Sequence, residues 1–142
     1  MPRFQPDYRP KPTPLMQAAA ADELCEVFDL LISGISIDEK DSRGWTALSY
    51  ACRSGNYEVA QQLLDSGADP NVHESYAMAD TPLSIAAGYG HFDLVRLLIA
   101  HGADPTVYAG GSGVRAECYA RWKDYNQISE FLRQQEDNWL RH

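Results

Sequence analysis

Apolar residues recur along this chain three or four positions apart, in short segments that end at a glycine. Between Gly55 and Gly67, the residues Val59, Leu63 and Leu64 fall on one face of a helix of 3.6 residues per turn. The segment 91–101 repeats that spacing. Because glycine at the end of a helix allows a tight reversal, the pattern predicts short helices arranged in pairs.

The pairs belong to an internal repeat. Thr46 opens the segment TALSYACRSGNYEVAQQLLDSGADPN, and Thr81 opens TPLSIAAGYGHFDLVRLLIAHGADPT, which aligns with it without a gap. Thr13 opens a third copy, TPLMQAAAADELCEVFDLLISGISID, so the copies begin 33 and 35 residues apart. A further 33 residues reaches Val114, where VRAECYARWKDYNQISEFL follows the pattern more loosely. A period of this length is typical of a solenoid, in which each repeat covers the apolar face of its neighbour.

The threonine start, the GH turn and the GAD ending together resemble the ankyrin-repeat family. The resemblance implies an all-α fold, a solenoid of stacked helix-turn-helix units with hairpin-like connecting loops and no regular sheet. It covers residues 12–134 as four repeats, near 12–44, 45–79, 80–112 and 113–134, with the first and last as degenerate caps. A proline-rich extended arm, 1–11, precedes them, and a tail, 135–142, either continues the last helix or frays from it.

The threonines at the repeat starts are predicted to cap the first helix of each pair through their hydroxyl groups. Ser49 and Ser84 stand where the family usually has histidine, and we expect their hydroxyls to bond locally. In the fourth repeat, the 33-residue spacing places Tyr119 where a small alanine usually sits. The same spacing puts Ile128, Phe131 and Leu132 at the positions of Val95, Leu98 and Ile99. The run AGGSG, residues 109–113, is expected to be a flexible loop in place of a regular hairpin tip.

The formal net charge is −8, and residues 22–104 alone carry fourteen acidic and four basic groups. This balance argues against nucleic acid as a partner, because such binding depends on phosphate neutralisation. It is compatible both with simple solubility and with a basic protein partner met by Asp38, Glu39, Asp41, Glu74 and Asp80. No apolar run approaches the ~20 residues of a membrane helix, and no signal segment opens the chain. A cytoplasmic monomer that binds neither membrane nor nucleic acid is therefore expected.

Little in the sequence indicates catalysis. Cys25, Cys52 and Cys118 are too few and too scattered for a disulfide framework, and each is interpreted as a small core residue. No phosphate loop, metal-binding helix or nucleophile elbow is present. We therefore expect no catalytic residue, no cofactor and no metal site.

Function is expected from the exposed positions that line the concave face of ankyrin arrays. Carried over by the resemblance, these positions hold residue types enriched in protein interfaces: Ser42, Arg43, Trp45, Arg53, Ser54, Tyr76, Met78, Asp80, Tyr89, Arg121 and Trp122. Trp45 is expected to be exposed, either as a contact for a partner or packed on Tyr76. Trp122 either contacts a partner or covers the end of the stack. Trp139 has the same two alternatives, a contact within the last repeat or a contact with a partner.

Three functions fit these observations. The first is a non-enzymatic module that holds or inhibits another protein through the concave groove. The second, more specific, is an immunity or antitoxin type of inhibitor that neutralises a basic bacterial toxin. The third is an enzyme subunit with hidden chemistry, for which Arg53, Arg121 and Asp80 are the only titratable candidates in the groove.

Overall fold

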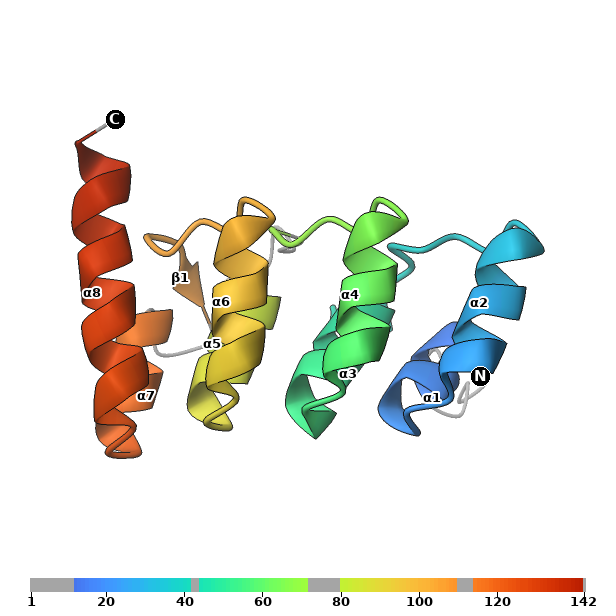
Figure 1. Ribbon diagram of the computed structural model, residues 1–142, viewed down its shortest axis with the longest axis horizontal. Helices are drawn as coiled ribbons and strands as arrows, with labels where there is room; N and C mark the ends of the chain where they lie inside the picture. The colour runs from blue at the N-terminus through green and yellow to red at the C-terminus, as the bar shows by residue number, and fades with distance from the viewer. Residues whose placement is uncertain (1–11, 42–43, 72–79, 110–113, 142) are drawn as a thin grey trace, which may run out of the picture.

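The computed structural model describes residues 12–41, 44–71, 80–109 and 114–141. In these ranges, eight helices follow one another as four antiparallel pairs in a single row (Figure 1). The helices are α1 (Pro14–Ala20), α2 (Leu24–Ile32), α3 (Ala47–Ser54), α4 (Tyr57–Asp65), α5 (Pro82–Gly88), α6 (Phe92–Ala100), α7 (Ala116–Trp122) and α8 (Asn126–Leu140). The all-α solenoid that the repeats predict is confirmed.

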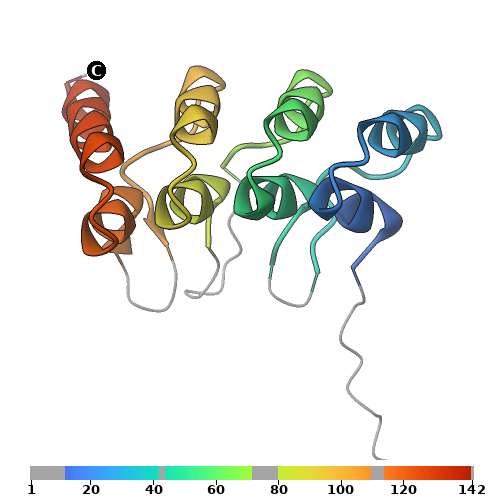
Figure 2. The same cartoon turned by 60° about the horizontal axis from the view of Figure 1, so that its bottom comes forward.

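The helices form two layers, as Figure 2 shows: α1, α3, α5 and α7 in one, and α2, α4, α6 and α8 in the other. Each helix contacts its neighbours in its own layer, and the first layer packs more closely than the second. Ala51, Ala86 and Ala120 explain this closeness, because they are fully buried and leave room for helices to approach. The closer layer, with the connecting loops beside it, therefore forms the inner side of the row.

Threonine caps set the start of the helices as predicted. Thr46 Oγ1 accepts from the backbone N–H of Ser49 at 3.4 Å, and Thr81 Oγ1 accepts from that of Ser84 at 3.1 Å. The serine hydroxyls bond locally in return, Ser84 Oγ donating to the Thr81 carbonyl at 2.9 Å. The serines that replace the family's histidine are therefore accommodated within their own helix turn.

A short hairpin stands where the sequence favoured a loop without regular pairing. The strands β1 (Tyr108–Ala109) and β2 (Val114–Arg115) pair antiparallel, Tyr108 opposite Arg115 and Ala109 opposite Val114. The all-α prediction holds, and the structure adds one ladder of two residues per strand, in which the two flanks of the glycine-rich segment run antiparallel and pair. The segment 110–113 itself lies outside the described residues.

The register of the fourth repeat differs from the prediction by one residue. The N–H of Tyr125 donates to the Ala120 carbonyl at 2.9 Å, just as that of His91 donates to the Ala86 carbonyl at 3.0 Å. Ala120 is therefore the small buried residue of this repeat, and Tyr119, which is half-buried, is not. The cause is the length of the connecting loop. The loop 101–115, which joins α6 to α7, has 15 residues, one more than the loop 33–46 between α2 and α3, so the fourth repeat is shifted by one residue.

The apolar residues of the last helix move with this register. Ile128 occupies the place of Leu94, and Leu132 that of Leu98; both are buried. The earlier assignment of Ile128, Phe131 and Leu132 to the positions of Val95, Leu98 and Ile99 is therefore wrong by one place.

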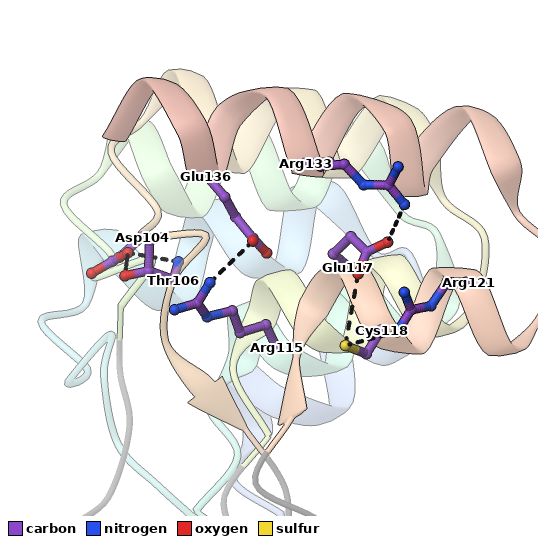
Figure 3. A network of polar contacts seen from close by, with 8 residues as sticks. All are labelled: Asp104, Thr106, Arg115, Glu117, Cys118, Arg121, Arg133 and Glu136. Atoms are coloured by element: carbon purple, nitrogen blue, oxygen red, sulfur yellow. Dashed lines mark hydrogen bonds and ion pairs between the residues drawn. The ribbon is translucent and has the colours of Figure 1, made fainter. Parts of the chain in front are cut away.

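In the corrected register, the fourth repeat has polar side chains at positions that are apolar in the other repeats. Glu117 occupies the position of the buried Leu83 and, although it is charged, is itself buried between α7 and α8. Its Oε1 atom accepts from Ser129 Oγ at 2.6 Å. The same atom accepts from the Arg133 guanidinium at 3.3 Å, as Figure 3 shows. Burial raises the pKa of Glu117, but the Ser129 hydrogen bond and the charges of Arg121 and Arg133 outweigh it, so the pKa lies below its usual value.

The segment predicted as a tail continues the last helix, because α8 runs to Leu140. Within it, Glu136 accepts from the Arg115 guanidinium at 3.2 Å, which ties α8 to the residue that begins α7 (Figure 3). Burial raises the pKa of Glu136, and its ion pair with Arg115 offsets that effect only in part. The last repeat thus ends the row with a longer helix held by charged side chains.

The cysteine prediction holds for one of three residues. Cys52 is fully buried in the core, and burial raises the pKa of its thiol. Cys25 is exposed on α2 and Cys118 is half-buried on α7, so their interpretation as core residues is wrong. Both lie in the terminal repeats, where no further repeat stacks on the helices and positions that are buried elsewhere stay open.

Candidate protein-binding groove

A hollow of about 410 Å³ lies on the inner side of the row and spans the second, third and fourth repeats. We call it the aromatic groove. Its lining residues come from the residue before the cap of α3, from α5 with residues on either side of it, from α7 and from the turn after α7: Trp45, Asp80, Ser84, Ile85, Gly88, Tyr89, Tyr119, Trp122, Lys123 and Tyr125.

Four of the predicted interface residues line this groove: Trp45, Asp80, Tyr89 and Trp122. Tyr89 and Trp122 have 51% and 58% of their surface exposed, which is high for such large apolar rings. The Trp122 ring lies edge-to-face with that of Tyr119, with 5.7 Å between the ring centroids. The fourth repeat therefore leaves much of Trp122 open to solvent.

Trp45 is not exposed, contrary to the prediction, because only 8% of its surface is accessible. Its ring packs edge-to-face on Tyr50, 5.3 Å between centroids. Its backbone N–H donates to Asp41 Oδ1 at 3.0 Å, and its carbonyl accepts from the Asp41 N–H at 2.9 Å. Trp45 is thus part of the scaffold that shapes one end of the groove, and replacing it would disturb folding.

Arg53 and Ser54 are exposed beside the groove without lining it. The Arg53 guanidinium carbon lies 5.9 Å from the centroid of the Trp45 ring, which is the range of a cation–π contact. The surface next to the groove therefore already holds one arginine on an aromatic face.

Arg121 lies elsewhere, and its assignment to the groove is wrong. In the corrected register it takes the place of Ala87, which is fully buried between neighbouring repeats. The third repeat packs on one side of α7, and in the described part of the chain no further repeat covers the other side, so Arg121 is exposed at the end of the row. Its guanidinium is directed to Cys118 Sγ at 3.7 Å, close to the Glu117 cluster (Figure 3). Ser42, Arg43, Tyr76 and Met78 lie outside the described residues.

The sequence analysis did not identify several of the lining residues. Three of them belong to the fourth repeat: Tyr119, Lys123 and Tyr125. Tyr119 was assigned to a core position by the 33-residue spacing. The signal that could have corrected this is Ala120, a small residue one place further along, in the position that alanine holds in the other copies.

The acidic residues near the groove play different parts. The Asp41 carboxylate is buried and accepts from the Trp45 N–H and the Tyr50 hydroxyl, so it closes a connecting loop rather than facing a partner. Asp38 accepts from the Asp69 N–H at 3.1 Å. Glu39 is exposed, and Glu74 lies outside the described residues. Of the carboxylates that the sequence suggests for a basic partner, those in the described ranges therefore include one, Asp41, that is buried and bonded within its own loop.

Asp80 lies half-buried in the groove, one residue before the cap of α5. Burial raises the pKa of its carboxyl, and in the described part of the chain no hydrogen bond or ion pair offsets that effect. Lys123 also lines the groove, but no ion pair joins the two side chains there. The charged form of Asp80 is thus less favourable in the folded protein than in the unfolded chain.

Replacing Asp80 with asparagine should therefore raise the Tm at pH 7, by roughly 1–3 °C. Because the folded pKa is raised, the carboxylate lowers stability above that pKa and has no such effect once it is protonated in both states. The difference between Asp80→Asn and the natural protein should accordingly disappear near pH 3, below the usual pKa of about 3.9. Thermal melts followed by circular dichroism from pH 3 to pH 7 measure this. The exposed Asp29→Asn is the control for the loss of one negative charge, and an equal gain in both variants would contradict the prediction.

A second hollow lies on the outer layer, lined by Ile99, Pro105, Gln135, Asn138 and Trp139. Trp139 is 46% exposed there, so it covers part of α6 and remains accessible as well. Among the described residues no group of three histidine, cysteine or acidic side chains could hold a metal ion. No helix in these ranges has both the length and the apolar character to cross a membrane.

Comparison with known proteins agrees with this architecture. Residues 5–74 match a family model of ankyrin repeats in three copies, and residues 80–108 match a model of the single ankyrin repeat. The chain belongs to the ankyrin-repeat family, whose repeats generally serve as non-catalytic modules for protein–protein interaction.

The relatives share part of the array only. The human mitochondrial disaggregase is 40% identical over 67 residues, which is 47% of this chain and 10% of that protein. The ankyrin repeat and KH domain-containing protein mask-1 of Caenorhabditis elegans is 48% identical over 69 residues, 47% of this chain and 2% of its own length. Ankyrin repeat domain-containing protein 40 of Mus musculus is 37% identical over 59 residues, 41% of this chain and 16% of that protein. The chain thus matches a small fraction of each of these relatives.

Proposed function

We propose that this chain is a non-enzymatic binding protein that holds or inhibits another protein through the aromatic groove. The observation that carries the proposal is the pair of exposed rings, Tyr89 and Trp122, in a groove that spans three consecutive repeats. Aromatic residues in a hollow are the common anchors of protein interfaces. Arg53 and Ser54 extend the same surface toward the second repeat.

The partner that suits this surface is basic. The chain carries a net charge of −8, and within the described residues no hydrogen bond or ion pair offsets the charge of the Asp80 carboxylate in the groove. Charge complementarity of this kind speeds association with a cationic partner. It supports holding and inhibition equally, and a basic toxin is one partner of that kind.

Replacing Trp122 with alanine should weaken the complex roughly thirtyfold, because truncating a central anchor costs about 2 kcal/mol of binding free energy. Affinity capture from the source cells, with the natural protein and its variants as baits, identifies the partner, and titration calorimetry with the purified partner measures the dissociation constant. The matched control is Trp139→Ala, which removes an equally large and similarly exposed ring from the outer layer.

The proposal predicts that Trp139→Ala binds like the natural protein and that both variants keep a helical spectrum. Equal affinity of Trp122→Ala and the natural protein would contradict the groove as the binding site.

A further inference from the structure

The middle of the aromatic groove is formed by a glycine for which the fold has little need. Gly88 is the last residue of α5, and its equivalents in the neighbouring repeats are Arg53 and Trp122. Its backbone is not left-handed, and a Cβ atom there would lie 3.7 Å from Tyr119 Cβ, an ordinary contact. Since alanine favours helix by about 0.5–1 kcal/mol over glycine, what Gly88 provides is space in the groove.

Aromatic rings line the same groove as Gly88. Tyr89 directly follows α5, and Trp122, Tyr119 and Tyr125 come from the fourth repeat. Aromatic faces attract cations through the ring quadrupole. The neighbouring contact of Arg53 with the Trp45 ring shows a guanidinium held in this way on the same surface.

The groove also contains a carboxylate that lacks a counter-charge. Asp80 is half-buried, and in the described part of the chain no hydrogen bond or ion pair reaches it. A desolvated carboxylate without a partner is unfavourable for folding. A cation that entered the groove would supply the missing counter-charge and lie against the aromatic rings at the same time.

We propose that the aromatic groove receives an arginine side chain of the partner protein, with its guanidinium paired to Asp80 and the side chain lying against the aromatic rings that line the groove. This inference rests on the proposed function and specifies what the groove recognises. Arginine suits it better than lysine, because the guanidinium is planar, is more weakly hydrated, stacks on aromatic faces and can bind a carboxylate through two parallel hydrogen bonds.

The test uses N-acetyl-arginine methylamide as the probe and the three tryptophan indole N–H signals of the ¹⁵N-labelled full chain as reporters. Trp45 and Trp122 line the groove, whereas Trp139 lines the outer hollow and serves as an internal control. The arginine probe should shift the Trp45 and Trp122 signals in a saturable way, with a dissociation constant on the order of millimolar for so small a ligand. The Trp139 signal should stay in place.

Two further probes, the citrulline and lysine analogues, and three variants test which chemical groups the binding requires. The citrulline analogue has nearly the same shape without the charge, and it should produce no saturable shift. Asp80→Asn should weaken binding of the arginine probe roughly tenfold, and Asp29→Asn, on the exposed face of α2, should leave it unchanged. Gly88→Leu should abolish the shift by filling the space, and its melting curve shows that the fold is retained.

Equal binding of the citrulline and arginine analogues would overturn the inference, as would unchanged binding to Asp80→Asn. A lysine analogue that binds as tightly as arginine would overturn the preference for a guanidinium. If the arginine probe fails while Trp122→Ala still weakens the complex with the partner, only this inference fails. If Trp122→Ala also has no effect on that complex, the proposed function fails with it.

Discussion

Replacement of Leu98 by alanine is expected to lower the free energy of unfolding by about 2–5 kcal/mol, the range for a large side chain removed from a well-packed core. Leu98 lies in α6, the second helix of the third repeat, and none of its surface is accessible. The loss combines the apolar contacts of the deleted atoms with the cavity that they leave. The equally buried Leu63, one repeat earlier, should behave in the same way.

Chemical denaturation followed by circular dichroism measures this effect, and Leu140→Ala is the matched control. Leu140 is the last residue of α8 and keeps 67% of its surface exposed, so its truncation should change the free energy of unfolding by less than 0.5 kcal/mol or so. A loss below that value for Leu98→Ala would show that α6 does not pack in the core as described.

The second large effect is expected at Gly55, where alanine should cost roughly 2–3 kcal/mol of stability. Gly55 has a φ of +77°, and a left-handed backbone disfavours any residue with a Cβ atom by about 1–2 kcal/mol. An added Cβ would also lie 2.8 Å from the His91 ring. The ring would have to move away, which breaks its 3.1 Å hydrogen bond with the Arg53 carbonyl, worth about 1 kcal/mol.

Two other glycines separate these contributions. Gly67 has a φ of +98° and nothing within 4 Å of a Cβ atom, so Gly67→Ala should show the backbone cost alone. Gly88 has neither feature, and Gly88→Ala should leave stability unchanged or raise it slightly. Free energies of unfolding for the three variants should therefore rank Gly88→Ala above Gly67→Ala above Gly55→Ala. Equal stability of Gly55→Ala and Gly67→Ala would mean that the His91 contact does not link the second and third repeats.

The binding predictions and the stability predictions fall on different residues. Leu98 and Gly55 hold the repeats together, whereas Trp122, Asp80 and Gly88 leave exposed ring surface, an uncompensated charge and unfilled space. Each of the latter three features is neutral or unfavourable for folding, and they meet in one groove. Residues that fit a fold poorly are those that function most readily explains.

The groove could be predicted from the sequence only in part. Tyr89 and Trp122 occupy positions that the repeat framework leaves free, and the structure shows both exposed and lining the groove; their contact with a partner stays a prediction. Arg121 was misplaced because the sequence period does not reveal a single extra residue in the loop 101–115. Trp45 was thought exposed because its burial depends on Tyr50 and Asp41, whose contacts form only when the connecting loop closes.

The sequence by itself determined the helices, their caps and the succession of repeats. These depend on local chemistry: threonine hydroxyls that satisfy the first N–H groups of a helix, glycines that allow reversals, and apolar residues at helical spacing. The tertiary structure alone decided the register of the fourth repeat, the burial of Trp45 and Glu117, and the presence of Asp80 and Gly88 in one groove. These depend on which side chains meet across separate repeats, and no local pattern encodes the solvation of a charge or the space left between two helices.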